Sequence, residues 1–263
     1  MDFPPRVAIP SCPLKVAVVM TAFNHSQYTR RAIESLFLST PDTGHVRFEF
    51  AVFDDCSIDD TAAAVNSFRN DRLTYWRSPR NSGVTYLWNE AYRQYTHHDY
   101  LAIVNNDVVF TPSWCIHILD ALIQHQCALG GPVTNGPGHV AQQDVRNFLS
   151  GYAPSDNWKD LLAVSRQLSG LKPFALDLIN GFCMVFDLRL LIEAQNNRPG
   201  EPFDPRNRNF GNEDEIQGRL KPRPLVVPES FVFHYKRVSI ADGGGEYVRY
   251  RPPDTNEKVH GTT

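Results

Sequence analysis

Residues 15–24 read KVAVVMTAFN and join a short apolar run to a polar segment, and this combination decides the fold. It recurs twice along the chain. FEFAVF at 48–53 leads into DDCSIDDT at 54–61, and YLAIV at 100–104 leads into NND at 105–107. Short apolar runs that end at polar residues are typical of buried strands. The three runs therefore predict three buried strands, each followed by a polar loop.

Helical patterns lie between these strands. Apolar side chains recur at helical spacing in 28–38, and further helices are expected at 59–68 (with Ser57 as its cap), at 84–95, and from Pro112 to 126, where proline suits the first turn. A short strand is expected at 73–76. This alternation predicts an α/β fold, a mostly parallel, Rossmann-like sheet flanked by helices. Beyond it we expect a loop at 130–138, a helix at 156–168, strand-like runs at 179–186 and 226–234, and a flexible tail at 241–263.

Composition excludes some classes of function and leaves others open. The chain has 263 residues, 26 Lys and Arg against 29 Asp and Glu, and a formal net charge of -3, which argues against the broad basic field of a nucleic-acid-binding protein. No stretch approaches the roughly 18 apolar residues that cross a bilayer, and residues 1–11 hold no apolar signal core, so we expect a soluble, cytoplasmic protein.

The five cysteines are scattered, and no two form a C-x-x-C pair. This pattern argues against a disulfide framework and against a structural zinc site, and it favours reduced, mostly buried thiols.

Polar side chains at the strand ends predict a ligand crevice, because the carboxyl ends of parallel strands meet at one edge of the sheet. Asp54, Asp55 and Asp107 directly follow apolar strands, whereas Asp59 and Asp60 are typical of helix and turn caps. The chain holds neither G-x-G-x-x-G after the first strand nor G-x-x-x-x-G-K-[ST], so we expect phosphate to bind through a divalent cation at Asp107 and not in a glycine loop.

Six motifs in this order, TAFN, DDCSIDDT, RNSGVTYLWNEA, DYLAIVNNDVVFTPSW, NGFCMVF and FGNEDEI, make the chain resemble glycosyltransferase family 2. The resemblance covers residues 15 to about 236. It implies the GT-A fold and transfer of a sugar from a nucleotide-diphosphate donor with inversion. On this basis we expect a single catalytic domain over 1–263. Its nucleotide-sugar-binding half is 14–126, its smaller, mixed acceptor half is 127–240, and its flexible tail is 241–263.

The resemblance also implies roles for individual residues. Those that match nucleotide-contacting positions are Thr21, Phe23, Asn24, Asp54, Asp55, Asn81, Gly83 and Asn106, with Asn89 downstream. Asp107 and His234 match the ligands of Mn²⁺ or Mg²⁺. Glu213 and Asp214 match the acidic pair in which the aspartate deprotonates the acceptor hydroxyl.

One departure concerns the metal motif, which here reads Asn105-Asn106-Asp107 with no carboxylate at its first position. We therefore expect weaker metal affinity, since each lost carboxylate removes charge beside the cation. The residues leave alternatives open. Glu213 and Asp214 also suit a helix first turn, and His234 also suits a buried histidine.

Several other residues also have expected roles in or near the site. We expect Asn180-Gly181-Phe182 to lie under a sugar, and the tail residues Arg249 and Arg251 are candidates to close over the diphosphate. His97 and His98 follow a helix, where solvation is expected. Packing is the expected role of Trp114 and Trp158, with sugar stacking as the alternative.

The favoured function is an inverting hexosyltransferase that uses a UDP- or dTDP-sugar, with surface polysaccharide as the default acceptor class. Lipid-linked, protein and nucleobase hydroxyls remain alternatives, and the sequence does not identify the sugar. Two other functions stay open: a non-catalytic domain that binds a nucleotide or glycan, motivated by the Asn-Asn-Asp motif, and a nucleotidyltransferase of similar architecture. The second lacks support because a glycine-rich, basic loop is missing after the first strand.

Overall fold

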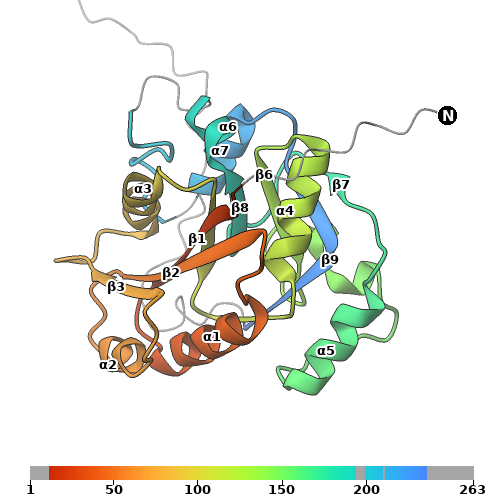
Figure 1. Cartoon of the computed structure of the whole chain (residues 1–263), viewed down its shortest axis with the longest axis horizontal. Coiled ribbons are helices and arrows are strands. Elements are labelled where there is room, and N and C mark those ends of the chain that lie inside the picture. Colours follow the sequence, from red (N-terminus) through yellow and green to blue (C-terminus); the bar gives the residue numbers. More distant parts are fainter. Residues whose placement is uncertain (1–11, 194–198, 210, 236–263) are drawn as a thin grey trace, which may run out of the picture.

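The computed structural model describes residues 12–193, 199–209 and 211–235. The predicted tail with Arg249 and Arg251 lies outside these residues. The first half of the chain builds a parallel sheet (Figure 1). Its strands are β1 (Leu14–Ala22), β2 (Val46–Asp54), β3 (Leu73–Arg77) and β4 (Tyr100–Asn105), in the order β3-β2-β1-β4. The helices between them are α1 (Ser26–Ser39), α2 (Thr61–Asn66) and α3 (Val84–Tyr95), so the predicted alternation is confirmed.

The second half extends the same sheet with mixed strands, which confirms the predicted mixed region. The order continues β4-β8-β6-β9-β5, and β7 pairs with β9. The strands are β5 (Val108–Phe110), β6 (Leu129–Val133), β7 (Phe174–Ala175), β8 (Cys183–Asp187) and β9 (Leu225–His234). The helices are α4 (Trp114–His125), α5 (Trp158–Gln167), α6 (Leu188–Glu193) and α7 (Asn212–Arg219), with 3₁₀ turns at Ala141–Gln143 and Val145–Asn147. β8 runs antiparallel to both β4 and β6, whereas β9 runs parallel to β6 and antiparallel to β5.

Alternate residues of β1 enter two separate hydrophobic cores, one on each face of the sheet. Val16, Val18 and Met20 pack in the core that contains side chains of α1 and α4. Ala17 and Val19 pack in the opposite core, with side chains of α3, α5, α6 and α7. A strand buried on both faces has a continuous apolar sequence, which is the reason that KVAVVM shows no polar alternation.

The prediction of a loop over 130–138 is wrong at its start, because 130–133 belong to β6. The glycines there serve close packing and not a turn. A Cβ on Gly130 would lie 3.0 Å from Ile118 Cγ2 of α4, and a Cβ on Gly131 would lie 2.9 Å from Ile179 Cδ1. Residues without a Cβ allow α4 and the 179–183 segment to approach this strand.

Two predicted helix starts are also wrong. Ser57 does not cap α2, which begins at Thr61 and is preceded by Asp60, because the Ser57 hydroxyl is bound to Asp54. Pro112 precedes α4, whose N-cap is Ser113.

The expectation that His97 and His98 are solvated fails for His98, of which only 6% is exposed. Trp114 is fully buried, as its packing role requires. All five cysteines are free, and three of them are buried. Among the described residues, no helix combines the length and apolar character needed to span a bilayer.

Candidate active site

The loop that follows β1 is held rigidly by the loop that follows β2. Thr21 lies buried near the end of β1, and Phe23 is half-buried beyond it. Asn24 has a left-handed backbone (φ 56°); its N–H donates to Ser57 Oγ at 2.7 Å, and its Oδ1 accepts from the Ile58 N–H at 2.9 Å. Asn tolerates this conformation better than most residues, and the reciprocal bonds fix the loop in one conformation.

Asp54 is fully buried at the end of β2 and organises that loop. Oδ1 accepts from the N–H of Ser57 at 2.9 Å and from its hydroxyl. Oδ2 accepts from the Tyr75 hydroxyl at 2.5 Å and from Arg77 at 3.3 Å, both on β3. Burial, followed by the hydrogen bond to Asp54, raises the pKa of Tyr75 to about 12. Four donors match the lone pairs of one carboxylate, so Asp54 is fully hydrogen-bonded within the protein and fixes the conformation of the loop after β2.

Asp55 holds the segment before α3. Its Oδ1 accepts from the Ser82 N–H at 2.6 Å and its Oδ2 from the Gly83 N–H at 2.9 Å. Gly83 needs its positive φ of 89°, and a Cβ there would overlap Arg208. Arg208 in turn donates to both the carbonyl oxygen and Oδ1 of Asn81, each at 2.7 Å. Asn81, Gly83 and Asp55 are therefore brought together, as the sequence motifs predict.

Asn89, on α3, is fixed by the backbone of residue 203 and lines a cavity that it shares with Asn81. It is 2% exposed; its Nδ2 donates to the Phe203 carbonyl at 2.8 Å and its Oδ1 accepts from the Phe203 N–H at 3.0 Å. The resemblance places Asn89 near the nucleotide, and the structure adds that its amide is a buried tie between α3 and residue 203.

The Asn-Asn-Asp segment begins at the last residue of β4, and Asn106 and Asp107 contact different parts of the structure. Asn106, 3% exposed, donates to the Asn24 carbonyl at 3.1 Å and to Thr29 Oγ1 at 2.9 Å, which fastens it to the first loop. Asp107, 4% exposed, turns instead toward the end of β9, where its Oδ1 lies 3.3 Å from His234 Nε2. The chain thus brings together two predicted ligands that are far apart in sequence.

The surroundings of His234 fit a metal ligand. Its Nδ1 lies 3.1 Å from the Gly136 carbonyl oxygen, and its ring stacks on Phe182 at 5.0 Å. A carbonyl oxygen only accepts hydrogen bonds, so Nδ1 carries the proton and Nε2 presents its second site to Asp107. Either a proton or a cation must separate that nitrogen from the carboxylate. A backbone carbonyl that fixes the second ring nitrogen is the usual support of a metal-ligating histidine, so Asp107 and His234 fit a divalent cation.

Glu213 and Asp214 begin α7 after the left-handed Gly211 (φ 71°). The Glu213 carboxyl lies against Gly181, where an added Cβ would be 3.3 Å from its Cδ and Oε1. Burial raises the pKa of Glu213, and the charge of Asp214 adds to that rise. The Asp214 side chain is 48% exposed, and its Oδ1 lies 3.7 Å from His139 Nε2. The two carboxyls thus differ: the pKa of Glu213 is raised by burial, whereas the Asp214 side chain is accessible to solvent.

Two segments connect the acidic pair to the Asp107–His234 pair. In 135–139, Asn135 and Gly136 contact His234, and His139 contacts Asp214. In 180–182, Phe182 stacks on His234, and Gly181 lies against Glu213. These segments also pack on each other, because a Cβ on Gly138 would lie 2.7 Å from Asn180 Oδ1.

A third connection joins the acidic pair to the Asn81–Gly83 segment. Residues 207–209, 211 and 212 precede or begin α7, and members of this group pack on the start of α3. The Thr85 N–H donates to the Arg208 carbonyl at 3.1 Å, and Asn212 Nδ2 donates to Thr85 Oγ1 at 3.0 Å. A cavity of about 680 Å³ lies beside this junction, lined in part by Asn81, Tyr86 and Arg208. It borders the donor-side residues but contains neither Asp107 nor Asp214.

His139, Gln143 and Gln217 were not predicted from the sequence. Gln143 Oε1 accepts from the Asn180 N–H at 2.6 Å, and Gln217 clamps the Ile179 backbone through bonds of 2.7 and 2.9 Å. A single histidine after a glycine and isolated glutamines carry no spacing signal, so only the structure reveals them.

Solved structures share this fold at low sequence identity. GalNAc-T7 with UDP, GalNAc and Mn²⁺ matches with a TM-score of 0.62 and 15% identity over 86% of this chain and 44% of the other. Staphylococcus aureus TarS 1-349 with UDP matches at 0.58 and 16%, over 84% of this chain and 60% of the other. The mannosyltransferase PcManGT from Pyrobaculum calidifontis, with GDP-Man and Mn²⁺, matches at 0.58 and 17%, over 89% and 60%. The present chain thus spans between 44% and 60% of these proteins.

A comparison with curated protein sequences gave no match. A family model, described as glycosyl transferase family 2, matches residues 17–185, well over half of the chain. The match includes the strand ends that carry Asp54, Asp55 and Asp107, and it stops before α7 and β9. The parallel sheet, its polar carboxyl edge and this match agree: the chain has the GT-A fold and belongs to glycosyltransferase family 2.

Proposed function

We propose that the chain is an inverting hexosyltransferase that moves a sugar from a UDP- or dTDP-sugar to an acceptor hydroxyl, assisted by a divalent cation. The observation that carries this proposal is the convergence of two pairs, Asp107–His234 and Glu213–Asp214, on the shared segments 135–139 and 180–182. Sugar transfer needs charge stabilisation at the leaving diphosphate and a base near the acceptor, and these pairs have the required chemistry.

Asp107 and His234 would hold the cation, either Mn²⁺ or Mg²⁺. When bound there, it supplies Lewis-acid stabilisation of the negative charge that develops on the diphosphate. Asn105 provides no carboxylate, so Asp107 is the only anionic group that the Asn-Asn-Asp motif offers.

Asp214 acts as the general base in this proposal. Its carboxylate takes the proton of the acceptor hydroxyl while the acceptor oxygen bonds to the anomeric carbon. The bond from that carbon to the diphosphate oxygen breaks, and its electron pair leaves with the diphosphate. Attack from the face opposite the leaving group inverts the configuration. The 48% exposure of the Asp214 side chain leaves it accessible to an acceptor.

Glu213 and His139 support Asp214 in different ways. Burial raises the pKa of Glu213, and its carboxyl lies against Gly181 beside the proposed base, where it would contact a sugar hydroxyl. His139 is a positioning residue, since its Nε2 lies 3.7 Å from Asp214 Oδ1 and restrains that carboxylate.

On the donor side, Asp55 is the carboxylate proposed to contact the base or ribose. Its two internal hydrogen bonds leave lone pairs available, whereas those of Asp54 are all engaged. Thr21, Phe23, Asn24, Asn81, Gly83 and Asn106 complete the proposed nucleotide site. Two of the similar structures hold UDP, and that of PcManGT holds GDP-Man, so both base classes belong in the test.

The first experiment is a thermal-shift screen of UDP-, dTDP- and GDP-sugars with Mn²⁺, followed by donor hydrolysis assays on the hits. We expect a uridine or thymidine donor to raise Tm and to be hydrolysed. Binding without turnover would point to the non-catalytic alternative. Failure of the whole panel to bind or react would refute the proposal.

The second experiment changes Asp214→Asn. Donor affinity should be unchanged, and turnover should fall at least about a hundredfold, the contribution expected of a general base. Glu215→Gln is the matched control, because Glu215 lies in the same helical turn and pairs with Arg219 at 2.8 Å. Full activity of Asp214→Asn would remove Asp214 as the base.

A further inference from the structure

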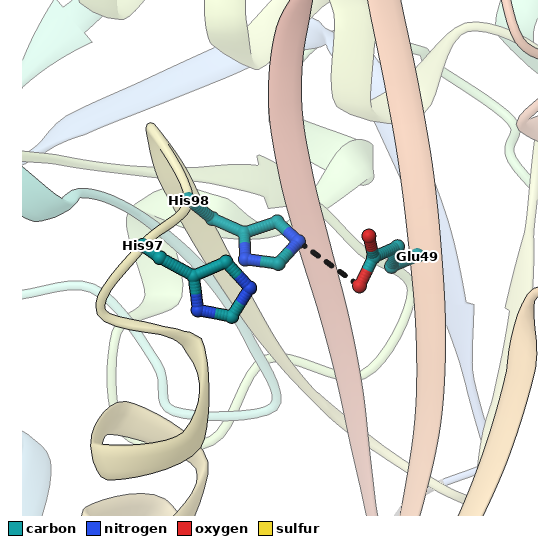
Figure 2. A group of neighbouring side chains, drawn as sticks. All are labelled: Glu49, His97 and His98. Carbon is teal, nitrogen blue, oxygen red and sulfur yellow. Dashed lines mark ion pairs between the residues drawn. The ribbon is translucent and has the colours of Figure 1, made fainter.

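Glu49, His97 and His98 form a second cluster of metal-ligating side chains, away from the candidate active site. Each offers one ligand atom, and these atoms all lie within 4.8 Å of one another. Among the described residues, no other group of three or more His, Cys, Asp or Glu side chains meets this condition. Figure 2 shows the His98 ring facing the Glu49 carboxylate, with His97 beside it on the same turn.

The fold brings these residues together from two elements. Glu49 lies in β2 on the same face as Ala51 and Phe53, which pack in the core that includes α3. His97 and His98 follow the end of α3, and the His98 N–H donates to the Tyr95 carbonyl at 3.0 Å. The rings of His97 and His98 are 4.5 Å apart. The chain reversal after α3 therefore aims both imidazoles at the amino-terminal part of β2.

The burial of His98 without aligned hydrogen-bond partners points to a ligand. Its side chain is 1% exposed, and in the described part of the chain neither of its ring nitrogens has a well-aligned hydrogen-bond partner. Buried polar atoms are nearly always hydrogen-bonded, so two unpartnered nitrogens in one ring need an explanation. Nε2 nevertheless lies 3.2 Å from Glu49 Oε2.

That separation matches two ligands of a single metal ion. Zinc–nitrogen and zinc–oxygen bonds are about 2.0–2.2 Å long, and a tetrahedral angle between them places the ligand atoms about 3.4 Å apart. Burial lowers the pKa of His98 despite the opposing effect of the Glu49 charge, which favours the neutral imidazole that coordinates metals. His97 is exposed, and the Glu49 side chain is 57% exposed, so an ion has access from solvent.

The cluster is distinct from the proposed Mn²⁺ or Mg²⁺ site in place and in chemistry. Glu49 precedes Asp54 by five residues of one strand, which corresponds to about 17 Å along β2. Two imidazoles and one carboxylate favour a borderline ion such as Zn²⁺, whereas Mg²⁺ prefers oxygen ligands.

We propose that Glu49, His97 and His98 bind one Zn²⁺ ion that ties the end of α3 to β2, with water as the fourth ligand. The argument against a structural zinc site came from the spacing of the cysteines, and it does not bear on this cluster because none of these ligands is a cysteine. Three protein ligands and one open position distinguish this site from closed, four-ligand structural zinc centres.

The test is calorimetric titration of metal-free protein with ZnCl₂. Asp107→Ala serves as the parent, because it removes the carboxylate of the proposed donor-side metal site. His98 is buried and its replacement risks misfolding, so the exposed ligands are changed instead, as His97→Ala and Glu49→Gln. His125→Ala is the control, since His125 is an exposed histidine at the end of α4.

We expect one Zn²⁺ per chain in the parent and in the control, and affinity weakened at least about tenfold in each ligand variant. Zinc should also raise the Tm of the parent more than that of His97→Ala. Absence of zinc binding by the parent, or unchanged affinity in either ligand variant, would overturn the proposal. Neither outcome depends on glycosyltransferase activity.

Discussion

Replacing Asn89 by alanine tests how much the donor side depends on a buried tie. Asn89 makes two hydrogen bonds, one to the N–H and one to the carbonyl oxygen of Phe203, and neither residue is more than 2% exposed. A buried polar group that loses its partner costs about 1–3 kcal/mol. Two such groups imply a loss of about 2–6 kcal/mol in the free energy of unfolding.

The effect should extend from stability to donor binding. Residue 203 belongs to the described stretch 199–209, which contacts Asn81 through Arg208 and precedes Glu213 in the chain. A loss of about 3 kcal/mol, within that range, corresponds to a fall in Tm of about 6 °C for a chain of this size. Donor KM should rise as well, because the Asn81 segment loses part of its support.

The assay is urea unfolding together with donor hydrolysis kinetics, compared with Gln94→Ala. Gln94 lies on the exposed face of the same helix, so its replacement should change stability by no more than about 0.5 kcal/mol. If Asn89→Ala is no less stable than Gln94→Ala, the role assigned to the tie is refuted.

Three further predictions concern charge and metal. Burial raises the pKa of Glu213 above its usual 4.5, so the protonated carboxyl favours the folded state at low pH and this contribution is lost as pH rises. Glu213→Gln should therefore unfold at a higher urea concentration than wild type at about pH 8, and it should show no such advantage at about pH 4. Equal gains at both pH values would contradict the raised pKa. Tyr75→Phe removes a hydrogen bond to the Asp54 carboxylate and should lower the free energy of unfolding by about 2 kcal/mol at neutral pH. Because the pKa of Tyr75 is raised to about 12, this contribution to wild-type stability should persist to about pH 10 and disappear by about pH 12. Urea midpoints measured against pH for both proteins would show this. Asp107→Ala should abolish the Mn²⁺-dependent part of nucleotide affinity measured by calorimetry, and an unchanged affinity with Mn²⁺ present would exclude Asp107 as a ligand.

The first half of the fold was predictable because strands and helices alternate there with clear periodicities. The strands predicted at 15–20, 48–53, 73–76 and 100–104 correspond to β1–β4, with ends that differ by two residues or fewer. The second half was harder. β6 contains Gly130, Gly131 and Pro132, which resemble a loop, and their role depends on contacts with α4 and the 179–183 segment. β5 has only three residues, too few to show a period.

The candidate site was likewise predictable from the sequence only in part. The polar strand ends predicted a crevice, and the resemblance predicted the pairing of Asp107 with His234, which the structure confirms as neighbours. The internal partners of Asp54 were not predictable, because Tyr75 and Arg77 reach it from the neighbouring strand through sheet register. The approach of His139 to Asp214 likewise depends on how the 135–139 segment folds back.

The position of β9 has a consequence for synthesis on the ribosome. This strand pairs with β6, β5 and β7, and it carries His234 at its end. A nascent chain that has emerged only to residue 224 already contains β1–β4 and the loops around Asp54 and Asp55, yet the imidazole that faces Asp107 is still missing. The loops after β1 and β2 can therefore form during translation, whereas Asp107 and His234 come together only after β9 has been added between β6 and β5. In the proposed function, an unfinished chain would therefore lack one of the two cation ligands.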